Sequence, residues 1–389
     1  MSNLVYKLNR RLLVFWRIRD FFSRLRSLKT TREQAIQLAM NWLIQAQDVR
    51  PGGGYSAGFD LRSGWLDDFP ETTGYIIPTF YDYFHLTADS TFKERAIRAL
   101  DWLLEVQNED GSISGFVEGA QRPIVYDTGQ VLFGLVRGYQ ETGEQKYLNA
   151  ATKAGDWLCD IMDSDGKWSK HTYCNLVHTY NTRVAWSLLE LYQINPDEKY
   201  RNAAEKNIEW AIGQQNETGW YAQNIFEPGG VVYTHATSYA TRGILECGLA
   251  LQNDRFIKQA QLAADAMLEK FSNGKLPGVL NLNWVPATNA VCLTGQAQAV
   301  IIWLKLFEYT NDRKYWRASK EALDFLVRTQ ERSFVFKAIH GAIKGSDPIT
   351  GPYLTYSYPN WAPKFFVDAL LLEQGILQKE QSEGERDDG

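Results

Sequence analysis

Six repeats of a two-helix pattern constrain what this chain can fold into. One helix type is amphipathic, with charges along one face and a large apolar residue near its C-terminal third. Those apolar residues recur every 53 to 60 positions, at Trp42, Trp102, Trp157, Trp210, Met267 and Phe325. The second type alternates with the first and carries few charges, as in YDTGQVLFGLVRGY and SYATRGILECGLAL. A helix that is apolar nearly all round is buried on both sides, whereas an amphipathic helix covers a core.

This alternation predicts an all-α fold, an (α/α)6 toroid with six inner helices surrounded by six outer helices. We expect one toroid domain over residues 30–375, preceded by a basic amphipathic segment (1–29) and followed by an acidic, disordered tail (376–389). Strands have little room in this pattern, apart from a hairpin in the insertion 331–357. A chain of 389 residues that is 44% hydrophobic has ample material for one large core.

Charge is distributed unevenly and limits the partners. The whole chain has a net charge of −5, whereas residues 1–30 carry eight Lys/Arg and one acid. The acidic body argues against nucleic acid as a partner. The segment LVYKLNRRLLVFWRIRDFFSRLRSL alternates apolar and basic residues at roughly helical spacing, and two interpretations stay open. It either makes peripheral contact with an anionic membrane surface or packs on the body and leaves its arginines in water.

The same composition bears on compartment and metal content. No apolar run is long enough to span a bilayer, and arginines interrupt the apolar runs near the N-terminus. We therefore expect a cytoplasmic protein or one peripheral to the inner membrane. The four cysteines, Cys159, Cys174, Cys247 and Cys292, form no CxxC pair, which predicts buried thiols without a disulfide framework. No spacing demands a metal, and we expect no cofactor.

A short motif recurs at the start of the buried helices. Thr73, Thr128, Thr182, Thr241 and Thr294 occupy it in five repeats, and Trp361 in the sixth. In a toroid the N-terminal ends of all inner helices converge at one end of the axis and form a bowl, a natural pocket. A residue that the architecture requires should recur in every repeat, so we interpret the repeated Thr as structural. Residues present in one repeat only are better functional candidates.

Three acids near the first buried helix meet that criterion. Asp67, Asp68 and Glu71 crowd its start, and no other repeat has three acids there. Asp68 and Glu71 favour initiation of the helix, since negative charge is stabilising at a helix N-terminus. We predict that the acids also line the bowl beside or opposite Asp127. Asp127, like Asn181 and Asn360, also suits a plain N-cap role.

The remaining candidates surround these positions. We assign candidate catalytic roles to Asp127, Asp68, Glu71, Tyr180 and His178. Candidate substrate-binding residues are Asp67, Tyr126, Asn181, Arg183, His235, Tyr239, Arg242, Trp284, Asn289, Tyr356, Asn360 and Trp361, and Lys364 belongs to the same cluster. Aromatic faces stack on sugar rings while polar groups bond to hydroxyls. Such a bowl favours a polysaccharide or oligosaccharide substrate over an isoprenoid.

The body, about residues 30–375, resembles the α/α-toroid superfamily. One branch is carbohydrate-active and includes unsaturated glucuronyl hydrolases, polysaccharide lyases, sugar 2-epimerases and glucuronyl C5-epimerases. The segments WLDDFPETTGYIIPT and YPNWAPKFF are similar to those of toroid proteins from bacterial exopolysaccharide biosynthesis clusters. That resemblance implies a role in polysaccharide production. VYDTGQVLF resembles the HDxGF segment of the glucuronyl hydrolases, which implies a general acid/base role for Asp127, although Tyr126 replaces the histidine.

Two chemistries are open within the carbohydrate-active reading. A glycoside hydrolase needs two carboxyl groups, which Asp127 with Asp68 or Glu71 would supply. A uronate lyase or epimerase needs a base, Tyr180, His178 or His235, and a cationic clamp, Arg183 and Arg242.

Two other classes are weighed against it. The loops QNEDGS, DSDGKW and QNETGW look like degraded copies of a terpene cyclase and prenyltransferase signature, which would imply an isoprenoid enzyme. However, LDDF lacks the first Asp of the DxDD motif of the cyclases. The third class is a non-catalytic toroid that binds glycan or scaffolds a polysaccharide synthesis complex.

Overall fold

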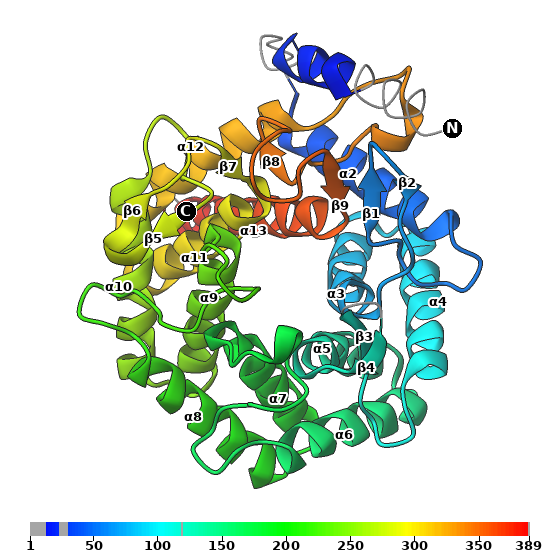
Figure 1. The fold of residues 1–389 in the computed structure, drawn as a ribbon, viewed down its shortest axis with the longest axis vertical. Helices are drawn as coiled ribbons and strands as arrows, with labels where there is room; N and C mark the ends of the chain where they lie inside the picture. Colours follow the sequence, from blue (N-terminus) through cyan, green and yellow to red (C-terminus); the bar gives the residue numbers. More distant parts are fainter. Residues whose placement is uncertain (1–12, 23–29, 118–119, 388–389) are drawn as a thin grey trace.

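Inner and outer helices alternate around one axis, as the sequence predicted (Figure 1). The computed structural model describes residues 13–22, 30–117 and 120–387. Within them, the outer helices are α2 (Arg32–Asp48), α4 (Ser90–Val106), α6 (Gln145–Asp160), α8 (Glu198–Gly213), α10 (Asp254–Lys270) and α12 (Arg313–Thr329). The inner helices are α3 (Pro70–Thr87), α5 (Val125–Thr142), α7 (Thr182–Ile194), α9 (Thr234–Ala250), α11 (Leu293–Thr310) and α13 (Trp361–Asp387). The chain therefore forms an (α/α)6 toroid.

The outer helices begin where the sequence places capping residues. Asp89, Asp197, Asn253 and Asp312 each accept a hydrogen bond from a backbone N–H in the first turn of the following helix. A tyrosine near the start of three outer helices, α6, α8 and α12, donates to an aspartate of the preceding outer helix. These pairs are Tyr147 with Asp101, Tyr200 with Asp156 and Tyr315 with Asp265, at 2.6 to 2.8 Å. The recurring acid–Tyr pattern thus both starts a helix and links it to its neighbour.

A glutamine in the loop after an outer helix links that loop to the next outer helix through hydrogen bonds. The side-chain amide of Gln107 donates to the carbonyl of Gly111 in its own loop, at 2.9 Å, and to that of Ala150 in α6, at 3.0 Å. Gly111 has φ +91°, and a β-carbon there would lie 2.4 Å from the Lys153 carbonyl, so only glycine fits. Gln215 makes the equivalent pair of bonds. The QNEDGS-type loops therefore have an architectural role.

The same device closes the toroid between its last and first hairpins. The amide of Gln330, just after α12, donates to the carbonyls of Ala35 in α2, at 2.9 Å, and of Gly341, at 3.1 Å. A β-carbon on Gly341 would lie 2.1 Å from the Leu38 carbonyl oxygen of α2. The insertion after α12 is thus held directly against the first helix of the toroid.

The repeated Thr-Gly motif brings the inner helices close together. A β-carbon on Gly74 of α3 would lie 2.4 Å from the Val131 Cα of α5, and one on Gly129 would lie 2.8 Å from the Val184 side chain of α7. The Thr128 hydroxyl accepts from the Ile113 backbone N–H at 2.9 Å. The motif recurs because packing requires it, which confirms the structural interpretation of the repeated Thr.

Short strands lie near the starts of the inner helices. β1 (Gly58–Asp60) pairs antiparallel with β2 (Gly64–Trp65) and β9 (Ser357–Pro359), with Phe59 opposite both Trp65 and Tyr358. The other antiparallel pairs are β3 (Ser114–Val117) with β4 (Ala120–Pro123), β5 (Leu280–Asn281) with β6 (Val285–Pro286), and β7 (Val291–Cys292) with β8 (Ser346–Asp347). Single-turn helices are η1 (Tyr173–Asn175), η2 (Thr179–Asn181), η3 (Leu282–Trp284) and η4 (Lys337–Ile339).

The hairpin expected within 331–357 is wrong. The strands there, β8 and β9, pair with β7 and β1 from other repeats and not with each other. The insertion crosses the top of the toroid because its strand partners belong to the fifth and first hairpins. The β3–β4 hairpin was not expected, and it lies beside the start of α5.

The tail differs from expectation. Helix α13 continues to Asp387, through most of the segment expected to be disordered. Ile376 is buried, and Lys379 and Glu380 pair with Glu308 and Arg313 of the body. These contacts explain why the helix continues past residue 375.

Residues 13–22 are helical and pack against the outside of the toroid, whereas the rest of the basic segment 1–29 lies outside the described residues. This part of the chain contacts the body as one interpretation expected, but Arg19 turns inward and apolar side chains turn outward. None of the described helices is both long and apolar enough to cross a membrane.

Candidate active site

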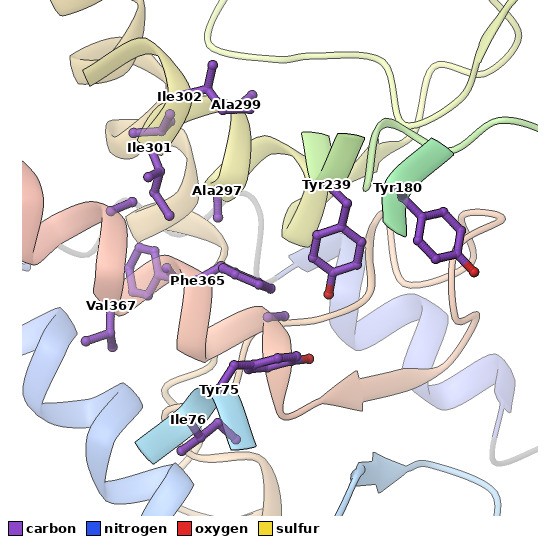
Figure 2. Close-up of a cluster of buried hydrophobic side chains, with 14 of the residues drawn as sticks. Tyr75, Ile76, Tyr180, Tyr239, Ala297, Ala299, Ile301, Ile302, Phe365 and Val367 are labelled. Carbon is purple, nitrogen blue, oxygen red and sulfur yellow. The ribbon is translucent and has the colours of Figure 1, made fainter. Parts of the chain in front are cut away.

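A cavity of about 480 Å³ lies at the end of the toroid where the inner helices begin. Its lining includes Glu71, Asp127, Glu227, His235, Trp361, Phe69 and Phe226 with Tyr126, Tyr173, Tyr180, Tyr233, Tyr239 and Tyr353. These side chains come from α3, α5, α9, α13 and the loops between them. Figure 2 shows Tyr75 and Tyr239 reaching from separate helices toward each other, with Tyr180 beside Tyr239. Aromatic side chains and carboxyl groups thus line one pocket.

Glu71 and Asp127 form an interacting carboxyl pair in this pocket. Glu71 lies in the first turn of α3 and Asp127 in the first turn of α5. Burial, with the nearby Asp127 carboxylate, raises the pKa of Glu71 well above its usual value, against the opposing charge of Arg183. Burial raises the pKa of Asp127 to about 7. When one carboxyl group of such a pair is ionised, ionisation of the other is disfavoured. The pair therefore tends to hold one proton near neutral pH.

The β3–β4 hairpin makes space for Asp127. Gly115 of β3 faces this side chain, and a β-carbon on Gly115 would lie 2.2 Å from Asp127 Oδ2. The Asp127 side chain is only 5% exposed. A glycine at this position therefore lets the carboxyl group lie between the hairpin and the start of α5.

Tyrosines form the wall next to the carboxyl pair. The Tyr126 ring lies edge-on to Tyr180, with centroids 5.1 Å apart, and 5.3 Å from Tyr239. Trp361 donates from Nε1 to the Tyr353 hydroxyl at 2.9 Å, which fixes both side chains at the rim. Rigid aromatic faces combined with a few polar groups are typical of small-molecule sites.

Arg183 lies beneath this wall. It is 2% exposed, donates from Nε to Gln130 Oε1 at 3.0 Å, and places its guanidinium 4.9 Å from the Tyr239 ring centroid. It lines a second cavity, of about 550 Å³, among the C-terminal halves of the inner helices. Arg183 therefore lies between the two cavities, where its charge acts on Glu71 and His235.

The two predicted histidines have different surroundings. His235, at the start of α9, lines the pocket and contacts the amide of Gln298 through Nδ1 at 2.6 Å. Burial and the Arg183 charge lower the pKa of His235 to about 3, so its imidazole is neutral. His178 is outside the pocket lining. Its Nδ1 and Nε2 face the backbone carbonyls of Ile225 and Tyr173, at 3.0 and 2.8 Å.

Comparison with known proteins identifies the family. The family model of the beta-L-arabinofuranosidase GH127 catalytic domain matches residues 25–272, more than half of the chain. The chain belongs to this family. No curated protein matches it in sequence. Glu71, Asp127 and His235 of this GH127-family chain fall inside the matched region, whereas Tyr353 and Trp361 fall outside it.

Solved structures show the same fold. An unsaturated glucuronyl hydrolase specific for heparin is similar with a TM-score of 0.72 and 14% identity, over 89% of this chain and 98% of that one. A D-mannose isomerase is similar with a TM-score of 0.72 and 13% identity, over 90% of this chain and 98% of that one. The cellobiose 2-epimerase from Bacillus thermoamylovorans B4167 is similar with a TM-score of 0.68 and 14% identity, over 87% of this chain and 96% of that one. With its family, this chain is a carbohydrate-active enzyme, as predicted. The solved structures show that it shares the toroid fold.

Two of the three clustered acids are not in the pocket of the GH127-family chain. Asp67 is 85% exposed and pairs with Arg50, and Asp68 lies 3.9 Å from the same guanidinium. The prediction that they line the bowl is wrong, because the loop before α3 turns them toward the outside. Only Glu71, inside the helix, reaches the pocket.

Several other candidates hold loops in place. Asn360 donates to the Ser56 carbonyl and the Thr72 hydroxyl, both at 2.8 Å. Trp284 donates to the Thr218 carbonyl at 2.8 Å, beside Trp220. None of Asn181, Trp284, Asn289, Tyr356 and Asn360 is among the residues that line the pocket.

Arg242 and Lys364 line the second cavity, not the predicted bowl. Arg242 pairs with Glu246 at 3.3 Å, and Lys364 pairs with Asp368 in the next turn of α13. Burial lowers the pKa of Lys364 to about 8 despite Asp368. Both residues lie one turn or more deeper along the inner helices than the side chains of the pocket.

Sequence reasoning missed the pocket residues that loops supply. Tyr173, Phe226, Glu227, Tyr233 and Tyr353 lie between helices, where the repeat gives no register. Their one signal was aromatic enrichment in the long loops before the inner helices.

Among the described residues, no group of three or more His, Cys, Asp or Glu side chains is arranged to hold a metal ion. Cys292 directly precedes α11, and burial raises the pKa of its thiol to about 12. The thiol is therefore protonated at neutral pH.

Proposed function

We propose that the protein is a glycoside hydrolase that uses Glu71 and Asp127 as its two carboxyl groups. The observation that carries this proposal is the interacting pair itself, which lines an aromatic pocket and has both pKa values raised. Glycoside hydrolysis requires one carboxyl group that is protonated and one that is ionised at the same pH. A coupled pair provides this state, because loss of one proton makes loss of the second less favourable.

The roles follow from the surroundings. Burial and the neighbouring Asp127 carboxylate raise the pKa of Glu71 well above its usual value, so we assign Glu71 as the acid that protonates the leaving-group oxygen. We assign Asp127, with a pKa of about 7, as nucleophile or as base toward water. Tyr126, Tyr180 and Tyr239 would stack on the sugar and offer hydroxyls to it. Arg183, beneath the wall, limits the rise of the Glu71 pKa.

The pocket suits the end of a short saccharide. Its volume of about 480 Å³ and its closed aromatic wall fit one or two sugar rings better than a long polymer crossing the surface. The family name supports a terminal arabinofuranoside as the first substrate to test. The resemblance of WLDDFPETTGYIIPT and YPNWAPKFF to proteins of exopolysaccharide clusters supports oligosaccharides from such polymers as the second.

A panel of chromogenic aryl glycosides, furanosides and pyranosides, followed by exopolysaccharide oligosaccharides, would test this proposal. We expect release of the aglycone from at least one glycoside, and a fall in kcat of about 100-fold or more in Glu71→Gln and in Asp127→Asn. Asp67→Asn is the matched control, because Asp67 is an exposed acid four residues from Glu71. Full activity of both pocket variants would refute the proposed roles.

One observation favours a second function, epimerisation or isomerisation of a free sugar. His235 is a neutral imidazole in the pocket, 4.2 Å between ring centroids from Tyr239, and a neutral imidazole can remove a proton beside a carbonyl. Incubation of reducing sugars in deuterated water distinguishes the two. Deuterium incorporation without glycosidic cleavage, lost in His235→Ala, would replace the hydrolase proposal with this one.

A further inference from the structure

The helical residues 13–22 are attached to the body through charged side chains. Asp20 is buried and accepts hydrogen bonds from Lys344 Nζ, at 2.5 Å, and from the Ile349 backbone N–H, at 3.1 Å. Arg19 makes two bonds to Glu331, at 2.7 and 3.2 Å. Buried ion pairs of this kind hold a helix in one rotational setting, because any other setting would leave a buried charge unpaired.

Aromatic contacts fix the same orientation. The Trp16 ring packs against Phe336, with centroids 4.8 Å apart, and the Arg19 guanidinium lies over both rings. Phe15 reaches the edge of Phe336 at 5.9 Å. The helix and the segment around Phe336 therefore form one continuous piece of surface.

The outward side of this piece is apolar. Phe21 is 53% exposed and Phe22 57%, and in the neighbouring segment Phe334 is 82% and Val335 83% exposed. Val14, Phe15 and Ile18 are also exposed. A helix on the surface of a globular protein normally turns its apolar side inward. Contiguous exposed apolar groups mark a surface that binds something.

Two exposed basic side chains lie among or next to these apolar residues. Arg17 is exposed within the helix, and Lys337 is exposed beside Val335. Both acids of the region, Asp20 and Glu331, are buried in ion pairs with Lys344 and Arg19. In sequence, the segment 1–29 that contains the helix has seven more basic than acidic residues. The charge that faces outward here is therefore positive, although the chain as a whole is acidic.

We propose that this apolar rim surface (Val14, Phe15, Ile18, Phe21, Phe22, Phe334 and Val335) binds to an anionic lipid bilayer. Phenylalanines and aliphatic side chains would enter the boundary between headgroups and acyl chains, while Arg17 and Lys337 contact lipid phosphates. A helix that lies in the membrane plane needs both elements, apolar depth and cationic flanks, and both are present.

The position of the surface is compatible with catalysis at a membrane. Helix 13–22, dark blue in Figure 1, lies outside the toroid and away from its axis. Both cavities lie at the ends of that axis, so a bilayer bound at the rim leaves the pocket open. The proposal does not depend on the proposed hydrolase activity.

Vesicle co-sedimentation of the full-length protein would test it. Vesicles of phosphatidylcholine alone are compared with vesicles that also contain phosphatidylglycerol, at low and high salt. We expect about 25-fold tighter binding to the anionic vesicles, weakened by salt, because Arg17 and Lys337 each contribute about fivefold near such a surface. Equal binding to both vesicle types, or no binding to either, would overturn the proposal.

Two double variants distinguish binding through this surface from nonspecific binding through any exposed apolar residue. F21S/F22S should reduce binding about tenfold or more, whereas L282S/V285S should not, although Leu282 and Val285 are as exposed on another part of the toroid. Arg17→Glu should lower binding to anionic vesicles only. Unchanged melting temperatures show that the variants fold. Equal loss in L282S/V285S would overturn the proposal, as would a lipid-free dimer in gel filtration that F21S/F22S abolishes, since the surface would then bind a second copy.

Discussion

The Asp127 Oδ2 atom lies where the side chain of residue 115 would begin, 2.2 Å from the position of a β-carbon on Gly115. Asp127 is near the start of an inner helix, whereas Gly115 belongs to a hairpin in the preceding loop. The hairpin thus shapes the space in which one carboxyl group of the pair is held. Its influence on the pocket is positional, since glycine offers no side chain of its own.

Gly115→Ala should therefore displace the Asp127 carboxyl group. We expect kcat to fall roughly 100-fold, because a shift of about 1 Å at a reacting group has effects of that size. The pH profile should also lose the ionisation near 7 that Asp127 gives it. Gly213→Ala is the control, since a β-carbon on that helical glycine meets no atom within 4 Å. A wild-type pH profile in Gly115→Ala would show that Asp127 has not moved.

Asp127 should also make stability depend on pH. Its folded pKa of about 7 exceeds the unfolded value near 4, so the folded protein binds this proton more tightly. The contribution of Asp127 to the free energy of unfolding should accordingly be highest below pH 4 and should be lost as the pH rises through about 7. Asp127→Asn removes the effect and should be more stable than wild type at pH 8, by about 4 kcal/mol. Urea denaturation at pH 5 and pH 8 measures this without any substrate. An Asp127→Asn variant that is less stable at pH 8 would contradict the assigned direction.

The repeat predicted the toroid because equivalent packing positions in successive helices need similar residues, and these recur in the sequence at regular intervals. Trp42 and Trp102 occupy equivalent places in successive outer helices, and the spacing survives changes in loop length. Glu71 and Asp127 were found by the same logic, since each is one of a kind at a position that the repeat defines. Both are in the first turn of a helix, where the direction of a side chain follows from helix geometry.

Residues in loops could not be placed in this way. Asp67 and Asp68 are four and three positions from Glu71, yet the chain turns between them and Glu71, and they lie beside Arg50 outside the pocket. Tyr353 reaches the pocket from an insertion whose strands pair with other repeats. Both outcomes depend on long-range strand pairing, which no local pattern specifies.

Closure of the toroid at Gln330 should contribute measurably to stability. Gln330→Ala removes two buried hydrogen bonds, those to the carbonyls of Ala35 and Gly341. We expect a loss of about 2 to 4 kcal/mol in unfolding free energy. Gln145→Ala, which removes only an exposed bond to Asn149, should change stability by less than about 0.5 kcal/mol. Similar losses in both variants would mean that the closure contributes nothing particular.

Substitution of His178 should lower stability, whereas substitution of His235 should lower activity. His178→Ala removes the ring that faces the carbonyls of Tyr173 and Ile225, and we expect a loss of about 1 to 3 kcal/mol in unfolding free energy. The activity per folded molecule should change little, because His178 is outside the pocket lining. His235→Ala removes a side chain that lines the pocket and should lower kcat/KM in either proposed chemistry.

Stability and activity must be measured on the same preparations to separate these roles. Burial lowers the pKa of His178, so its folded pKa is below the unfolded value and the wild type should lose stability as pH falls below about 6.5. His178→Ala should lose less over that range. A His178→Ala enzyme that is as stable as wild type but inactive would restore His178 to the catalytic residues, where the sequence first placed it.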